Sequence, residues 1–150
     1  MRFTYFTDYS FRVLIYLGLY PDRLVSIGEI SKAYGVSRNH VVKVVHHLVK
    51  HGFVASTRGC GGGLRLARAP RAINLRDVVR ATEPDFDLVE CFNRSDSRCR
   101  IAPSCGLAPV LVEALGAFHQ VLGSYDLGDV LARSTSVTKR LGRPARHQTA

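Results

Sequence analysis

Three of the four cysteines, Cys91, Cys99 and Cys105, lie in one short polar stretch of the chain. Seven residues separate the first two cysteines and five the last two, and the intervening Asn, Ser, Asp and Pro residues predict a loop. Three thiolates on one loop can bind a single metal centre, but they are one ligand short of a four-ligand site. The sequence therefore indicates a metal site to which a residue outside the loop contributes.

Other cysteine chemistry is also possible with these residues. The loop could hold a structural zinc ion, or Cys60 could form a thiol-based redox switch with one loop cysteine. Cys60 stands alone among glycines, so we expect an exposed thiol rather than a ligand. An enzyme is not indicated, because the chain lacks a Ser/His/Asp order, an HExxH motif and a CxxC motif.

Charge is distributed unevenly along the 150 residues. Residues 1–80 carry thirteen Lys and Arg against four Asp and Glu, residues 81–132 three against eight, and residues 133–150 five against none. A basic front half favours a polyanionic partner, most simply nucleic acid, although a basic surface kept for solubility would have the same charge.

Composition points to a cytoplasmic globular protein. The hydrophobic fraction of 46% is ordinary for a packed core, and no apolar run approaches the roughly 18 residues of a membrane span. No signal peptide is recognisable at the N-terminus. In the cytoplasm, metal or redox chemistry of cysteine is favoured over disulfides.

The N-terminal region predicts an amphipathic helix from about residue 7 to residue 20. Thr7 is interpreted as its N-cap, and apolar residues recur at helical spacing until a Pro-Asp pair. Asp8 in the first turn suits the helix dipole, and Arg12, four residues on, can pair with it. From the residues alone, capping is the favoured role of Asp8.

Two short helices separated by a glycine turn follow. Ser26 is placed to cap the first helix, residues 27–34, with Glu29 completing a capping box. Gly35 supplies the turn, and Ser37 caps the second helix, which runs to residue 51.

This helix pair is typical of a helix-turn-helix motif, in which the start of the second helix meets base edges. An αα-hairpin with a solvated face is the alternative. The residues predicted to contact DNA from the second helix and its cap are Ser37, Arg38, Asn39, His40, Lys43 and His47.

A glycine-rich β-hairpin, or wing, is predicted directly afterwards. Its strands are residues 52–56 and 64–66, and four of the five residues at its tip are glycine. Such a tip can approach a phosphate backbone or enter a narrow groove, and Arg58, Gly62 and Arg65 are predicted to contact DNA there. A phosphate-binding nucleotide loop is not indicated, because no Gly-Lys-Ser/Thr follows.

The second half of the chain predicts three further helices. Asn74 is expected to cap one that ends at a Glu-Pro pair and joins the wing to the cysteine loop. From Gly106 to about Tyr125, leucines and aromatic residues recur every three or four positions, which predicts a helix ~30 Å long. One apolar stripe of that length favours packing on a second copy as well as on its own domain. A short helix over residues 127–131 follows.

Four segments together resemble one known family. They are Phe6-Thr7-Asp8-Tyr9, Tyr34-Gly35-Val36-Ser37-Arg38-Asn39-His40, Arg58-Gly59-x-Gly61-Gly62-Gly63-Leu64-Arg65-Leu66 and the three-cysteine loop. They resemble the NsrR-type repressors, which sense nitric oxide and belong to the bacterial iron–sulfur winged-helix regulators that also include IscR. The resemblance covers about residues 1–132. The cysteine loop is shared by cluster-binding members, and the Ser-Arg-Asn-His start of the recognition helix is closer to the NsrR type.

The resemblance implies a homodimer on palindromic operator DNA, with one iron–sulfur cluster per subunit on the three loop cysteines. In NsrR-type members the fourth ligand is an acidic residue of the partner's first helix, which corresponds to Asp8, and Arg12 is expected to act in coupling. IscR-type members use a His three residues after the third cysteine, where this chain has Ala108. A [4Fe–4S] cluster is favoured over [2Fe–2S].

The expected function is repression of transcription that ends when nitric oxide reacts with the cluster. A carboxylate is a harder ligand than a thiolate and is held less firmly on iron. Release of Asp8 would therefore break a tie between subunits and move the recognition helices off their half-site spacing. The alternatives are an iron- or redox-responsive repressor with the same loop, or a zinc or thiol-switch regulator.

The predicted fold class is mainly α with a small β-wing. Its parts are a winged helix-turn-helix domain with an N-terminal helix over residues 1–83, a cluster-binding loop over 84–105, a dimerisation helix region over 106–132 and a basic tail over 133–150. The tail is expected to be disordered and to add non-specific affinity for DNA.

Overall fold

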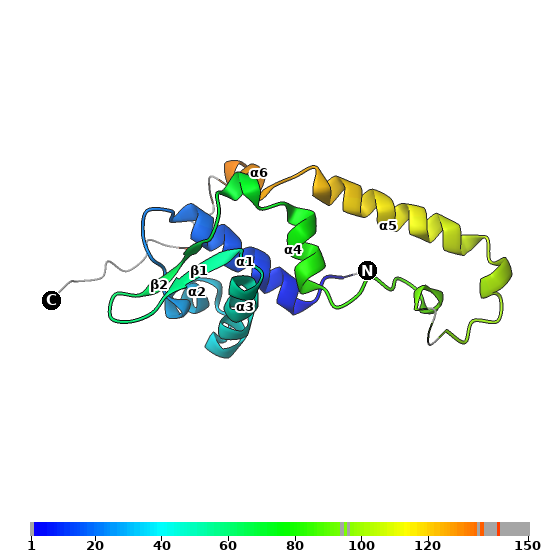
Figure 1. Cartoon of the computed structure of the whole chain (residues 1–150), viewed down its shortest axis with the longest axis horizontal. Helices are drawn as coiled ribbons and strands as arrows, with labels where there is room; N and C mark the ends of the chain where they lie inside the picture. The colour runs from blue at the N-terminus through cyan, green and yellow to red at the C-terminus, as the bar shows by residue number, and fades with distance from the viewer. Residues whose placement is uncertain (1, 94, 96, 135, 137–140, 142–150) are drawn as a thin grey trace.

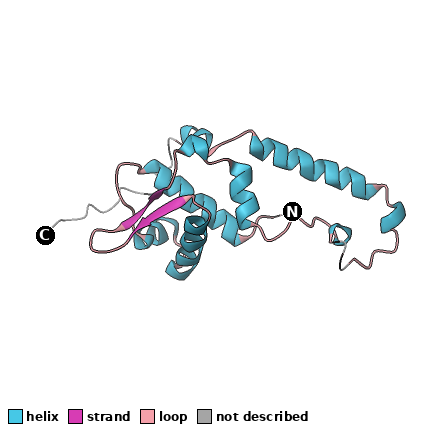
Figure 2. Cartoon of the chain, viewed as in Figure 1, coloured by secondary structure: helices cyan, strands magenta, loops and turns pink. Residues whose placement is uncertain are grey.

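The computed structural model describes residues 2–93, 95, 97–134, 136 and 141, so most of the predicted tail lies outside the described residues. In chain order the elements are α1 (Tyr5–Leu19), α2 (Ile27–Tyr34), α3 (Arg38–Lys50), β1 (Val54–Thr57), β2 (Gly63–Leu66), α4 (Leu75–Thr82), α5 (Leu107–Gly123) and α6 (Leu127–Ala132). Figure 1 shows α1 to α4, the hairpin and α6 grouped in one body, from which α5 and the segment before it extend as an arm. Strands occur only in the hairpin among the described residues (Figure 2), so the predicted mainly α fold with a β-wing is confirmed.

Helix α1 begins earlier than its sequence predicts. The hydroxyl of Thr4, not Thr7, accepts the capping hydrogen bond, from the Thr7 N–H at 3.3 Å. The Thr4 N–H also donates to Glu83 Oε1 at 2.9 Å, which fixes this residue against the end of α4. Thr7 is fully buried instead. A tertiary contact therefore decides which of two capping residues starts the helix.

The helix-turn-helix forms as predicted, with one exception at Glu29. Ser26 caps α2 and Ser37 caps α3, and Gly35 between them has a φ of 63°. The Glu29 carboxylate does not close the predicted capping box, because it accepts hydrogen bonds from Tyr16 and Arg23. These two donors hold α2 against α1.

The wing is an antiparallel pair whose register runs from Val54 opposite Leu66 to Thr57 opposite Gly63. An isolated bridge between Val25 and Leu64 fastens the hairpin to the segment before α2. The strands therefore lie one or two residues from their predicted positions, and the glycine-rich tip is free to project from the body.

The hydrophobic core belongs to the body alone. Its fully buried side chains come from every helix there and from the hairpin; they include Leu14, Leu17, Ile30, Leu48, Ile73, Val78 and Leu127. Among the described residues, no buried hydrophobic side chain comes from positions 80–126. None of the described helices is both long and apolar enough to cross a membrane.

Helix α4 joins the body to the arm. Asn74 caps α4 as predicted, accepting from the Arg76 N–H at 3.0 Å, and its Nδ2 donates to the Gly123 carbonyl at 2.7 Å. The C-terminal end of α5 therefore lies beside the start of α4, whereas its N-terminal end carries the cysteine loop away from the body (Figure 1).

Candidate metal centre and nucleic-acid interface

The three loop cysteines lie where the chain is held mainly by short turns. Cys91 is in a 3-10 turn, Glu90–Phe92, and Cys105 directly follows a second one, Ala102–Ser104. Cys99 lies between the two turns, and all three thiols are free and half-buried. The predicted loop is thus confirmed, with two short 3-10 turns inside it.

Two of the thiols face a common hollow. Cys91 and Cys99 line a cavity of about 720 Å³ between the loop and the first turns of α5. The remaining lining residues are Phe86, Asp87, Phe92, Ser97, Ala102, Ala108, Val112 and Leu115. Apolar side chains beside two half-buried thiols lower the polarity around sulfur, and such surroundings tune a metal centre held there.

The donor set fits an iron–sulfur cluster that takes one further ligand. Three free thiols on one loop supply the soft sulfur ligands that such a cluster needs. In the part of the chain that the structure describes, no three His, Cys, Asp or Glu side chains are already gathered to hold a metal ion. A metal centre held by all three thiols would therefore require the loop to close.

Asp8 and Arg12 form the ion pair that their spacing predicts. Arg12 Nη2 donates to Asp8 Oδ2 at 2.7 Å and Arg12 Nε donates to Oδ1 at 3.1 Å. The side chains of Arg12 and Asp8 are 40% and 43% exposed. Solvent therefore screens the pair, which contributes at most about 1 kcal/mol to stability. Among the described residues, Asp8 and the loop cysteines are not part of any group of three side chains that could hold a metal ion.

The start of α3 presents the residues predicted to read DNA. Ser37, Arg38, Asn39, His40 and Lys43 are all exposed. The Ser37 hydroxyl is occupied by the His40 N–H at 3.3 Å, so it serves as a cap whatever else it contacts. This surface leaves cationic and amide side chains free for base edges and phosphates.

At the wing, Arg58 and Arg65 are exposed, and Cys60 is the exposed thiol that was predicted. Glycine is required at position 62 for packing alone, because a Cβ there would lie 2.3 Å from the Thr57 carbonyl oxygen. A contact between this glycine and DNA stays a prediction.

His47 lies apart from the other predicted DNA contacts. Its Nε2 is 2.6 Å from the Ala81 carbonyl oxygen on α4, and its ring meets the edge of Phe6 and stacks on His51. A contact between DNA and Nε2 of His47 would require this hydrogen bond to break. Helical spacing alone places His47 on the outer face of α3, and the carbonyl that it meets is 34 residues further along the chain.

The arm exposes a regular apolar stripe, which we call the α5 seam. Its members recur with spacings of three and four residues: Leu107, Val110, Ala114, Ala117 and Val121. Leu107, Val110 and Val121 are 58%, 58% and 59% exposed. The α5 seam shares Leu107 with the predicted stripe but otherwise lies beside it, because the other members of that stripe are half-buried: Leu111, Leu115, Phe118, Leu122 and Tyr125. Alternating spacings of three and four are those of a two-helix seam.

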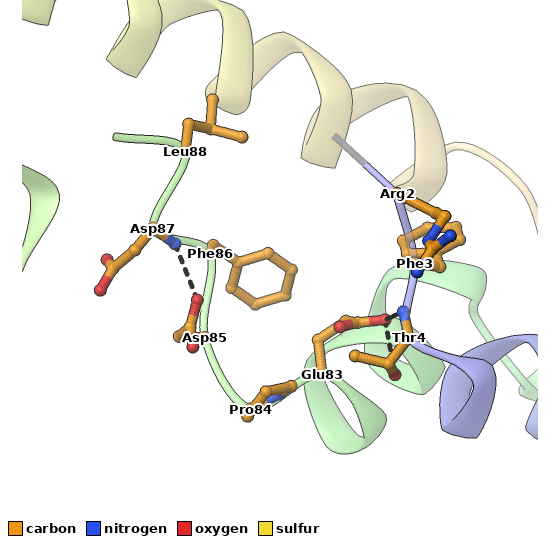
Figure 3. A pocket seen from close by; sticks show the side chains of 9 residues that line it. All are labelled: Arg2, Phe3, Thr4, Glu83, Pro84, Asp85, Phe86, Asp87 and Leu88. Atoms are coloured by element: carbon orange, nitrogen blue, oxygen red, sulfur yellow. Dashed lines mark hydrogen bonds between the residues drawn. The ribbon is translucent and has the colours of Figure 1, made fainter. Parts of the chain in front are cut away.

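A second hollow lies where α4 leads into the arm (Figure 3). Residues 2–4 and 83–88 enclose about 310 Å³. On its wall Glu83 Oε1 accepts hydrogen bonds from the Thr4 N–H and, at 3.2 Å, from the Thr4 hydroxyl. Further along, the rings of Phe86 and His119 of α5 pack edge-to-face, with 4.5 Å between their centres. Burial, followed by the positive charges of Arg80 and Arg76, lowers the pKa of His119.

Known proteins resemble this chain over nearly its whole length. The family Rrf2, described as an iron-dependent transcriptional regulator, matches residues 3–133. The HTH-type transcriptional regulator NsrR of Bacillus licheniformis is 45% identical over 142 residues, which cover 94% of this chain and 99% of that protein. NsrR of Bacillus subtilis is also 45% identical, covering 94% and 97%.

Solved structures agree with the fold. IscR of T. potens superposes with a TM-score of 0.70 at 25% identity, covering 92% of this chain and 91% of that one. CymR, the global cysteine regulator of B. subtilis, has a TM-score of 0.72 at 23% identity, covering 89% and 98%. The curated relatives are transcriptional regulators, which confirms the prediction of a DNA-binding regulator rather than an enzyme. Because the family match spans residues 3–133 and the curated relatives align over almost their full length, the chain belongs to the Rrf2 family of winged-helix transcriptional regulators.

Proposed function

We propose that the protein is a homodimeric cytoplasmic repressor that binds palindromic operator DNA and releases it in response to nitric oxide, sensed by an iron–sulfur cluster. The observation that carries this proposal is a loop with three free, half-buried thiols beside a cavity, in a chain 45% identical to regulators named NsrR. A family described as iron-dependent supports iron over zinc.

The cluster would be held by Cys91, Cys99 and Cys105 of one subunit and by Asp8 of the partner subunit. We favour one [4Fe–4S] cluster per subunit, with [2Fe–2S] as the alternative. When bound, it supplies iron, to which nitric oxide binds. Asp8 is suited to be the replaceable ligand because a carboxylate holds iron less firmly than a thiolate does.

Arg12 gives Asp8 a second partner within its own helix. In the structure the two side chains form a bidentate ion pair, and both side chains are half-exposed. Such a pair is worth about 0–1 kcal/mol, so it does not prevent Asp8 from binding iron. Once the iron is lost, the ion pair with Arg12 would keep the Asp8 carboxylate ordered on its own helix. This exchange of partners between iron and Arg12 is the coupling role that we assign to Arg12.

The α5 seam supports dimerisation. Two copies that pack along it would bury three exposed branched side chains each, and Ala114 and Ala117 at its centre allow the helix backbones to approach closely. In such a dimer the arm of one subunit can extend toward the body of the other, where the partner's Asp8 lies.

DNA binding would use the exposed start of α3 and the wing. The exposed Arg38, Asn39 and Lys43 would read bases, at about 1–3 kcal/mol each, and the exposed Arg58 and Arg65 would contact the backbone. The basic tail falls mostly outside the described residues, and its non-specific affinity for DNA stays a prediction.

The test is anaerobic purification followed by a visible spectrum and an operator gel shift before and after stoichiometric nitric oxide. A brown protein that binds a palindromic duplex and releases it on nitrosylation supports the proposal. A brown protein that ignores nitric oxide but releases DNA on iron chelation favours the iron-responsive alternative. A colourless protein, made with iron supplied, favours zinc or thiol chemistry.

The Asp8 assignment has its own test. Asp8→Ala should keep the protein dimeric but change the cluster spectrum and speed cluster loss, whereas Asp22→Ala, which removes an exposed carboxylate after α1, should leave both unchanged. Identical spectra and nitric oxide responses in Asp8→Ala and wild type would remove Asp8 from the ligand set.

A further inference from the structure

Three consecutive residues at the end of α4, which we call the α4 junction, bind three other parts of the body. They are Ala81, Thr82 and Glu83. Ala81 meets α3, Thr82 meets α1, and Glu83 meets the N-cap of α1. The chain leaves this junction through Pro84 and reaches Cys91 only seven residues later. The segment that carries the first cysteine is thus anchored where the other elements converge.

The contact with α3 has a defined chemistry. Ala81 is in the last turn of α4, so its carbonyl has no partner within the helix and accepts from elsewhere. Because a carbonyl only accepts, His47 Nε2, at 2.6 Å, must carry the hydrogen. The edge of Phe6, at 5.1 Å between ring centres, and the stacked ring of His51, at 4.2 Å, fix the imidazole in this orientation.

The contacts with α1 are equally specific. The Thr7 hydroxyl donates to Thr82 Oγ1 at 2.8 Å, and the two residues are 0% and 6% exposed. The Thr82 hydroxyl passes its own hydrogen to the Val78 carbonyl at 2.9 Å. Thr7 directly precedes Asp8, so a displacement of this turn of α1 acts on Thr82 without an intervening residue.

We infer that the α4 junction carries the state of the cysteine loop to the recognition helix, with His47 as the positioning residue that transmits it, rather than as a DNA contact. In each subunit this junction therefore meets the cysteine loop of one proposed metal centre, through Pro84, and the Asp8 ligand of the other, through Thr7. From it, one hydrogen bond leads into α3. His47 lies nine residues after Arg38, about 13 Å along the helix axis, so a shift there tilts the residues at the start of α3.

This inference rests on the proposed function, and one experiment separates the two. A duplex is first selected from a random DNA pool with the anaerobic wild-type holoprotein. Its affinity is then measured for holoprotein and for cluster-free protein, and the ratio of the two is the coupling. Wild type should give a coupling of roughly tenfold or more. His47→Ala should reduce it to less than about threefold, with an unchanged cluster spectrum and dimer.

Two matched variants define the cause. His46→Ala removes an exposed neighbouring imidazole and should keep the wild-type coupling. His47→Gln should restore much of the coupling, because its side-chain amide can donate to the Ala81 carbonyl from nearly the same position. If His47→Ala does not fold, Thr82→Val, which removes the hydroxyl that accepts from Thr7, replaces it and should also lower the coupling.

Two results would overturn the inference while leaving the proposed function intact. In the first, His47→Ala weakens holoprotein and cluster-free protein by the same factor, so that the coupling is unchanged and His47 acts as a direct DNA contact. In the second, neither affinity changes. If wild type itself binds the duplex equally well with and without its cluster, the proposed function fails, and the inference fails with it.

Discussion

Replacing Val110 by glutamate tests whether the α5 seam holds two copies together. In the single chain this valine is 58% exposed. Full burial of a valine contributes about 1.5–3 kcal/mol, so covering the remaining surface contributes roughly 1–2 kcal/mol. A two-fold interface contains the residue twice, which makes the loss roughly 2–4 kcal/mol per dimer. At about 1.4 kcal/mol per factor of ten, the dimer dissociation constant should rise roughly 30- to 700-fold.

Sedimentation equilibrium at several protein concentrations measures this constant. The matched control is Gln120→Glu, which adds the same charge at an exposed position of α5 outside the seam. A carboxylate buried in the seam without a partner adds to the loss, so the calculated range is a lower bound. Equal dissociation constants for Val110→Glu, Gln120→Glu and wild type would show that the seam is not the interface.

Three further predictions concern the body, each measured by urea unfolding. Leu48→Ala in α3, where the side chain is 0% exposed, should lower the free energy of unfolding by about 2–5 kcal/mol; a loss under about 1 kcal/mol would mean that the core collapses around the gap. Gly35→Ala should cost about 1–2 kcal/mol, entirely from the φ of 63°, because no atom lies within 4 Å of the added Cβ; an unchanged stability would show that the turn relaxes. Burial alone would raise the pKa of Glu29, but hydrogen bonds from Arg23 and Tyr16 outweigh it and lower the pKa. Stability from this carboxylate is therefore present above the ordinary pKa of glutamate and lost as the pH falls through the lowered value, and Glu29→Gln should flatten that part of the pH profile; parallel profiles would contradict it.

The elements that local signals define could be predicted from the sequence. Ser26, Ser37 and Asn74 all cap the helices predicted for them, because a capping side chain bonds to backbone only two or three residues away. Gly35, and Gly59 and Gly61 of the wing tip, likewise follow from backbone conformations that other residues rarely adopt.

The roles of Thr4, Glu29 and His47 could not be predicted from the sequence, because each depends on a contact outside its own helical turn. Local spacing does not distinguish Thr4 from Thr7 as the cap of α1, because the second partner of Thr4, Glu83, is 79 residues away. Glu29 satisfied the pattern of a capping box, yet two donors from α1 and the following turn take its carboxylate. His47 was interpreted from its place on a polar helix face, whereas the carbonyl that it meets belongs to α4.

For the candidate metal centre too, some features could be predicted from local spacing and others depend on the fold. The three cysteines are contiguous enough for the loop to be recognised, and the pairing of Asp8 with Arg12 follows from a spacing of four residues. The cavity beside Cys91 and the position of the α5 seam depend on how the arm folds back on itself, which periodicity alone does not determine.

The placement of the core has a consequence for how such regulators can diversify. Because none of the described residues at 80–126 adds a buried hydrophobic side chain, the cysteine loop can change in length or ligands without unfolding the part that reads DNA. Even doubling a flexible loop costs only about 0.6 kcal/mol of closure entropy. The body with its helix-turn-helix and wing can thus be kept while the loop varies. Relatives that share this fold at TM-scores of 0.70 and 0.72 bear names as different as IscR and a global cysteine regulator.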